Sequence, residues 1–306
     1  MIRKLKYADH DEWLKLRSGY IGGSDAAAVV GLNRFSTPFS LWCEKTGKTS
    51  PFGGNLATEV GSYLEEFVAK KFAEESGKSV RRRNVSFVND IYPWAIANID
   101  REIVGEDAGL EIKTTSALNL RSFKGGEYPD NYYVQCVHYL AVTERKKWYL
   151  AVLIGNSEFR IFEIERDEEE IAALMQAEKE FWDLVTSGTP PRVDGEQSTT
   201  SALSEAFHAS DDTVSLCDDD ATAAEYASLS AQIKALEKLR DEKANIIKSH
   251  MEEASEGYTA KYKITWREQT RSSFDSKRFI SDHPDTDLSG YYKTSASRVF
   301  RLTERK

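Results

Sequence analysis

The chain has 306 residues and carries 41 basic against 50 acidic side chains, a formal net charge of −9. This length predicts about two domains, and 34 aromatic residues supply enough core material to exclude a wholly disordered chain. The three cysteines form no CxxC pair, which disfavours a zinc ribbon, and neither an apolar leader nor a run of about 20 apolar residues is present. These features predict a cytoplasmic protein without a membrane segment.

Residues 1–195 have the pattern of an α+β domain. Apolar residues recur at helical spacing along residues 56–75, and Gly77 follows as a stop signal. Period-2 alternation on both sides of a Gly-rich turn predicts a strand pair over residues 99–104 and 110–114. Further helices are predicted over residues 12–18, 26–30, 38–46, 132–142 and 168–186, and further strands over 85–88, 94–97, 148–154 and 159–164.

The composition changes after residue 195. Residues 196–220 are rich in Ser, Thr and Asp and are predicted to be a linker. Residues 221–306 are predicted to be a C-terminal extension, made of a long helix over 221–254 and a small α/β part. The small part has predicted strands over 258–265 and 297–302 around a short helix near 276–281.

The strand pair carries the most informative polar residues of the chain. On a strand, side chains alternate, so Glu111 and Lys113 share one face, and the hairpin turn brings Asp100 beside Glu111. Two carboxylates and the Ile112 carbonyl form an oxygen set that Mg²⁺ or Mn²⁺ prefers, and Lys113 is placed to act on a metal-bound water. The alternative is a surface hairpin with an ordinary Glu-x-Lys.

Two further segments could contribute to the same site. Glu65 lies at the border of the apolar face of its helix, where it could be another metal ligand or a solvated charge. Arg17 and Ser24 flank a Gly-Gly pair before a helix N-terminus, which suggests an anion pocket. The simpler alternative is a helix capped by Ser24 and a surface Arg17.

In this order, the pieces resemble the YqaJ-type viral recombinases, relatives of phage lambda exonuclease within the PD-(D/E)xK nuclease superfamily. The resemblance covers about residues 9–193 and rests on residues 17–24, the Gly-x-x-x-Glu ending at Glu65, Asp100, and Glu111-Ile112-Lys113. It extends to the helix that contains Gln135, at a position that lines the active site in the family. Asn98-Ile99-Asp100 stands where the family usually has Ser-Pro-Asp.

The resemblance implies an α/β/α restriction-endonuclease-like fold, a mixed central sheet flanked by helices. It implies a 5′→3′ exonuclease that digests one strand of linear double-stranded DNA and leaves 3′ overhangs for single-strand annealing. Glu65, Asp100, Glu111 and Ile112 would bind one or two Mg²⁺ ions, and Lys113 with Gln135 would position the water. Arg17 and Ser24 would hold the 5′-phosphate.

The resemblance also implies a single-strand annealing recombinase as partner, a homo-oligomer such as a ring trimer, and a phage or prophage origin in a bacterial cell. Two other interpretations remain open: another PD-(D/E)xK DNA endonuclease, and a non-catalytic module that binds DNA ends or a partner protein. The net charge does not exclude DNA, because residues 196–257 carry −9, residues 258–306 carry +5 and residues 1–195 carry −5.

Overall fold

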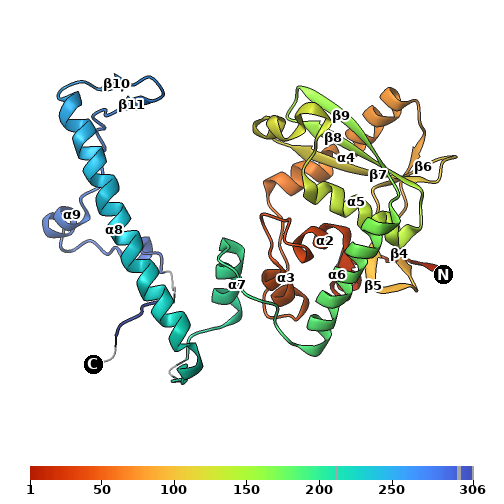
Figure 1. Cartoon of the computed structure of the whole chain (residues 1–306), viewed down its shortest axis with the longest axis horizontal. Helices are drawn as coiled ribbons and strands as arrows, with labels where there is room; N and C mark the ends of the chain where they lie inside the picture. The colour runs from red at the N-terminus through yellow and green to blue at the C-terminus, as the bar shows by residue number, and fades with distance from the viewer. Residues whose placement is uncertain (211, 295–297, 305–306) are drawn as a thin grey trace. The chain divides into compact units, whose positions relative to one another are not determined.

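A five-stranded mixed sheet forms the centre of the first unit, Met1–His208, in the computed structural model, which describes residues 1–210, 212–294 and 298–304 (Figure 1). Its strands lie in the order β3-β6-β7-β8-β9, and β7 and β8 are the parallel pair among antiparallel neighbours. The predicted strand pair over 99–104 and 110–114 is confirmed, and the predicted strands over 148–154 and 159–164 form an antiparallel pair. The bounds are β3 Val80–Arg81, β6 Arg101–Ile103, β7 Ala108–Thr115, β8 Lys147–Ile154 and β9 Glu158–Glu165.

A second sheet has the order β1-β4-β5-β2. Its strands are β1 Ile2–Leu5, β2 Ile21–Gly22, β4 Ser86–Asn89 and β5 Tyr92–Ala97. The short β2 lies parallel to β5, with Ile21 opposite Ala95. Because β5 leads directly toward Asp100, this pairing brings the N-terminal segment close to the strand pair that carries the acidic residues.

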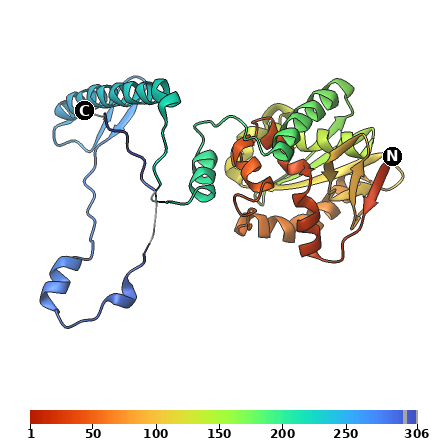
Figure 2. The same ribbon diagram turned by 90° about the horizontal axis from the view of Figure 1, so that it is seen from below.

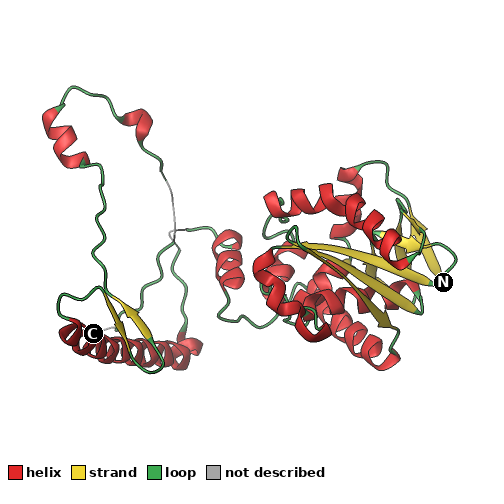
Figure 3. Cartoon of the chain, turned by 90° about the horizontal axis from the view of Figure 1, so that it is seen from above, coloured by secondary structure: helices red, strands yellow, loops and turns green. Residues whose placement is uncertain are grey.

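Helices cover both faces of the five-stranded sheet, as Figure 3 shows by secondary structure. Leu110 on β7 packs against Val68 and Phe72 of α4 (Leu56–Ser76). On the opposite face, Trp148 and other β8 side chains pack against α5 (Asp130–Thr143) and α6 (Glu168–Ser187). Alternation along the strands thus sends apolar side chains to two separate cores, which confirms the predicted α/β/α class.

A third apolar cluster holds the remaining helices of this unit together. It joins α2 (Gly23–Val29), α3 (Pro38–Lys45), α6 and α7 (Gln197–Ala206), while α1 (His10–Ser18) precedes β2. Helix α7 lies inside the segment predicted to be a linker. Ala202 is buried there, and the Thr37 and Thr199 hydroxyls lie 2.7 Å apart. The first unit therefore extends to His208.

In the second unit, Ala209–Lys306, the described residues form a long helix, a small hairpin and a further short helix (Figure 2). Helix α8 (Asp220–Met251) is followed by β10 (Glu256–Tyr258) paired with β11 (Lys263–Thr265), and then by α9 (Ser276–Asp282). The predicted strand over 297–302 begins outside the described residues, and the described residues 298–304 form no strand. Short 3₁₀ turns occur at Ala117–Gly126, Cys217–Asp219 and Ser289–Tyr291.

Among the described residues, no helix combines the length and the apolar character needed to cross a lipid bilayer.

Candidate active site

The register between β6 and β7 places Asp100 next to Glu111. Arg101 of β6 pairs with Leu110 of β7, so Asp100, just before β6, faces Glu111. The Asp100 carboxylate accepts a hydrogen bond from the Ile112 backbone N–H at 2.7 Å. Because the N–H and C=O of one strand residue point to the same side, the Ile112 carbonyl also faces Asp100. The predicted oxygen set of Asp100, Glu111 and Ile112 therefore lies at one edge of the strand pair.

Glu111, Lys113 and Gln135 form one hydrogen-bonded cluster between β7 and α5. The Lys113 ammonium lies 2.7 Å from Glu111 Oε1 and donates to Gln135 Oε1 at 2.8 Å. The Gln135 amide nitrogen donates to Glu111 Oε1, also at 2.8 Å. Lys113 carries only donors and a carboxylate carries only acceptors, so these partners fix the orientation of the amide.

The Asp100 and Glu111 carboxylates repel each other, and the nearby Lys113 ammonium offsets this repulsion only in part. Burial, and then the charge of Glu111, raise the pKa of Asp100 well above its ordinary value. Burial alone would lower the pKa of Lys113, but Glu111 and Asp100 outweigh it and the pKa is raised, so Lys113 is an ammonium at neutral pH. Among the described side chains, Glu111 Oε2 is buried without a hydrogen-bond partner. An orphaned carboxylate oxygen beside a second carboxylate and a carbonyl fits a hard divalent cation.

Glu65 lies near these carboxylates but has another partner. Its charge contributes to the raised pKa of Asp100, so the two are close. However, its Oε1 accepts a hydrogen bond of 2.5 Å from the buried Arg101, which also donates to the Asp100 carbonyl. Within the described part of the chain, no three His, Cys, Asp or Glu side chains are grouped closely enough to hold a metal ion. The structure thus brings Asp100 and Glu111 together and holds Glu65 at an ion pair with Arg101.

Arg17 and Ser24 meet at a small cavity. The Arg17 guanidinium donates to Ser24 Oγ at 2.8 Å and to Asp25 Oδ1 at 3.1 Å. The cavity has a volume of about 100 Å³, and its lining includes both side chains and the Gly22-Gly23 backbone. This is the volume that about three water molecules share in the liquid, so the cavity has room for a small anionic group. Arg17 and Ser24 therefore lie together at this cavity. The alternative interpretation, in which Ser24 is the N-cap of the helix, is wrong, since the N-cap of α2 is Gly22.

Sequence reasoning missed several residues around this cavity. Trp13, Asn98 and Tyr139 complete its lining, and the Trp13 indole donates to Asn98 Oδ1 at 3.0 Å. Behind it, the buried Lys45 ammonium lies 2.8 Å from Asp25. Asn98 follows β5 and could have been found from its place two residues before Asp100. Trp13 and Tyr139 gave no signal, because an aromatic residue on a helix is usually core material.

Two other polar segments have structural partners. In the basic run of residues 78–83, Lys78 pairs with Glu106, and Arg81 and Arg83 both pair with Glu102. His138 is fully buried and hydrogen-bonded to Glu178 and the Ile96 carbonyl, so it is packed in the core.

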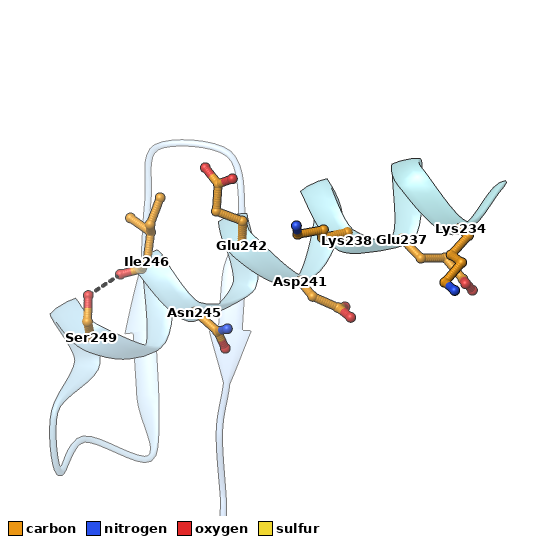
Figure 4. Close-up of a pocket in the computed structure, with 8 residues that line it drawn as sticks. All are labelled: Lys234, Glu237, Lys238, Asp241, Glu242, Asn245, Ile246 and Ser249. Atoms are coloured by element: carbon orange, nitrogen blue, oxygen red, sulfur yellow. Dashed lines mark hydrogen bonds between the residues drawn. The ribbon is translucent and has the colours of Figure 1, made fainter. Parts of the chain in front are cut away.

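A concave surface on α8 in the second unit has no comparable chemistry. Residues of this one helix line it, and Figure 4 shows them along the helix rather than converging on one point. Their charges alternate in sign, from Lys234 and Glu237 to Lys238 and Asp241. Such alternation is typical of a solvated helix face.

Comparisons with known proteins show which family and which fold this chain resembles. The YqaJ-like viral recombinase domain family matches residues 12–146. The chain is 38% identical over 311 residues to the uncharacterized protein YqaJ of Bacillus subtilis (strain 168). This match covers 98% of this chain and 95% of that protein. The crystal structure of the alkaline exonuclease LHK-Exo from Laribacter hongkongensis matches with a TM-score of 0.50 at 19% identity, over 59% of this chain and 94% of that one.

The structure of LHK-Exo in complex with dAMP gives the same TM-score at 20% identity, with the same coverage of both chains. At such low identity these two matches establish the fold alone.

Proposed function

Because the chain belongs to the YqaJ-like viral recombinase family, we propose that it is a metal-dependent 5′→3′ exonuclease. It digests one strand of linear double-stranded DNA and leaves a 3′ single-stranded overhang for recombination by annealing. The observation that carries this proposal is the cluster of Asp100, Glu111, Lys113 and Gln135, in which one buried Glu111 oxygen has no partner among the described side chains.

Asp100, Glu111 and the Ile112 carbonyl are the residues that would hold the divalent cation, with Glu65 added when its carboxylate leaves Arg101. Mg²⁺, or Mn²⁺ in its place, would supply charge stabilisation at the scissile phosphate and activation of the attacking water. One or two ions are compatible with these ligands. The donor set is entirely oxygen, which matches the preference of both ions.

The side chains of this chain then position the reaction. Lys113 holds a positive charge beside Glu111, where it can stabilise the negative charge that develops on the phosphate. Gln135 holds Lys113 through its carbonyl and Glu111 through its amide nitrogen, so both keep a fixed orientation. The water oxygen bonds to phosphorus, the bond from phosphorus to the 3′ oxygen breaks, and that oxygen takes up a proton.

Arg17 and Ser24 would set the direction of digestion. The cavity that they line has a guanidinium and a hydroxyl at its wall, which suit a terminal 5′-phosphate. A DNA end seated there would be held near Gln135, because Tyr139 lines the cavity and accepts a hydrogen bond from Gln135. A closed homo-oligomer, such as a ring trimer around DNA, and a single-strand annealing recombinase are the partners that this role would require.

Digestion of linear duplex DNA with Mg²⁺, compared with the same reaction in a chelator, tests the proposal. Lys113→Ala should lower the rate at least about 100-fold, the loss expected when a preorganised charge is removed from an active site. Lys146→Ala removes the same charge from an exposed loop position and serves as the matched control. Full activity of the Lys113→Ala protein would refute the assignment.

A closed circular plasmid distinguishes the exonuclease from an endonuclease. An exonuclease leaves the circle intact, because it offers no end, while nicking of the circle would replace the proposal with an endonuclease. Binding of DNA ends with no digestion under any metal condition would instead favour a non-catalytic module.

A further inference from the structure

Tyr139 connects the anion cavity to the acidic cluster. Its side chain lines the cavity together with Arg17 and Ser24. On its other side, its hydroxyl oxygen accepts a hydrogen bond of 2.9 Å from the amide nitrogen of Gln135, one helical turn earlier on α5. Tyr139 thus lines the cavity and contacts Gln135 of the acidic cluster.

The phenol ring is held firmly in this position. A Cβ atom on Gly23 would lie 2.5 Å from the Tyr139 ring, so α2 can approach α5 this closely only with glycine at that position. The ring also packs against Trp148, with ring centroids 5.1 Å apart. The hydroxyl therefore cannot move away from the cavity without disturbing the contact between two helices and a strand.

The hydrogen-bond directions leave the hydroxyl proton available. Lys113 occupies the carbonyl oxygen of Gln135, so the amide nitrogen is the donor toward Tyr139. The tyrosine oxygen accepts that bond, and within the described part of the chain its O–H makes no other hydrogen bond. Burial raises the pKa of Tyr139 well above its ordinary value, so the proton is present at neutral pH.

We propose that Tyr139 is a specificity-determining residue that donates a hydrogen bond to a terminal phosphate in the Arg17 cavity and thereby fixes Gln135 and Lys113 in their working orientation. This inference rests on the proposed function, because it refines how that site recognises its substrate. An occupied cavity would favour the orientation of Gln135 that holds Lys113, so the enzyme would act faster on ends that carry a 5′-phosphate.

The test uses Tyr139→Phe, which keeps the ring and removes the hydroxyl. Tyr133→Phe is the matched control: it removes a hydroxyl from the same helix, one that donates to Glu170 rather than lining the cavity. The first measurement is the affinity for hairpin DNA that ends in either a 5′-phosphate or a 5′-hydroxyl. Fluorescence anisotropy measures this binding with a chelator present. A hydrogen bond to a charged group predicts that Tyr139→Phe lowers the preference for the phosphate about tenfold.

The second measurement is the single-turnover digestion rate with both DNAs saturated by protein. Tyr139→Phe should lower the rate about tenfold on phosphorylated ends and less than about twofold on hydroxyl ends, while Tyr133→Phe changes neither. An unchanged phosphate preference in binding, or an equal loss of rate on both ends, would overturn the inference.

Failure of the proposed function would look different from failure of this inference. A wild-type protein that digests no DNA with Mg²⁺ refutes the exonuclease, and the binding preference then still decides the role of Tyr139. A wild-type protein that digests DNA while Tyr139→Phe behaves as wild type refutes the inference alone.

Discussion

Asp25 is a single buried carboxylate between two cations. Lys45 lies 2.8 Å from one oxygen and Arg17 lies 3.1 Å from the other, and the Gly22 N–H also donates to it. Burial alone would raise the pKa of Asp25, but Lys45 and Arg17 outweigh it and lower the pKa to about 2. Among the residues that line the cavity, Arg17 carries the charge, which favours an anionic ligand there.

Asp25→Asn should therefore destabilise the protein, because it leaves the buried Lys45 without its partner. We expect a loss of about 3–5 kcal/mol in the free energy of unfolding at pH 7, measured with urea. Since the folded pKa lies below the ordinary value, the charge of Asp25 stabilises the fold above about pH 4 and stops doing so as the pH falls toward 2. The difference between the two proteins should shrink over that range. A constant difference would contradict this explanation.

His138 and Glu178 form a buried pair that shares a proton. His138 Nδ1 lies 2.7 Å from Glu178 Oε1, and Nε2 lies 3.0 Å from the Ile96 carbonyl. The pKa of each group is raised: burial raises that of Glu178, while for His138 the carboxylate outweighs the opposite effect of burial. Both directions mean that the pair keeps one proton between the ring and the carboxylate to a higher pH than either group alone.

This pair predicts a loss of stability at alkaline pH. Above about pH 6.5 the unfolded histidine has lost its proton, whereas the folded pair still holds one, so stability falls as pH rises toward the folded pKa. The slope approaches about 1.4 kcal/mol per pH unit. Urea unfolding of wild type and Glu178→Gln from pH 6 to 9 measures it. A similar slope in both proteins would show that another group is responsible.

At the scale of elements, the parallel contact between β7 and β8 depends on one glycine. Gly109 lies opposite Trp148, and a Cβ atom added there would lie 2.2 Å from the indole ring. The indole is fully buried against α5, so it has no space into which to retreat. This glycine therefore allows β7 to pair with β8 beside the Trp148 indole, and the pairing keeps Glu111 buried.

Gly109→Ala should cost about 1–3 kcal/mol of folding free energy, the usual cost of forcing extra volume into a packed core. Gly53→Ala makes the same chemical change where no heavy atom lies within 4 Å, and should be close to neutral. Thermal unfolding of the two variants beside wild type provides the measurement. Equal stability of all three would mean that the sheet adapts without strain.

Helix α4 shows which features of a helix can be predicted from a sequence pattern. Its bounds and the Gly77 stop were predicted closely, because helical periodicity and a left-handed C-cap are local signals. Of the apolar residues that recur along this helix, Val68 and Phe72 are buried, whereas Val60 and Phe67 are exposed. Periodicity identifies a face of a helix, but the length of the sheet beneath it decides how much of that face is covered.

The candidate site shows the same division. Asp100, Glu111 and Lys113 were predictable, since strand alternation and a short turn fix their neighbourhood. The ion pair that holds Glu65 was not, because Arg101 is adjacent to Asp100 in sequence and its partner lies 36 positions away on α4. The cavity lining was equally hidden, since it needs α1, β5 and α5 to meet. Local pattern thus predicts the acidic cluster, and tertiary packing decides its neighbours.

At the scale of the whole molecule, the position of α7 decides where the first unit ends. Composition predicted a boundary after residue 195, because the segment that follows is rich in Ser and Thr. These residues nevertheless form a helix in which Thr199 and Ala202 are buried, and Ala202 belongs to the third apolar cluster. The backbone N–H of Ser50 also donates to Glu205. The small polar residues of α7 suit a close helix contact rather than a flexible link.

Truncation tests this boundary. A protein ending at His208 keeps the contacts of α7 within the first unit and should unfold cooperatively, near the midpoint of that unit in the full chain. A protein ending at Gly195 loses α7 and exposes part of the third apolar cluster. The buried Thr37 hydroxyl loses its Thr199 partner and keeps the hydrogen bond from the Ser40 N–H. Removing one buried hydrogen-bond partner alone costs about 1–3 kcal/mol. The shorter protein should therefore have a clearly lower urea midpoint, and equal midpoints would place the boundary back at residue 195.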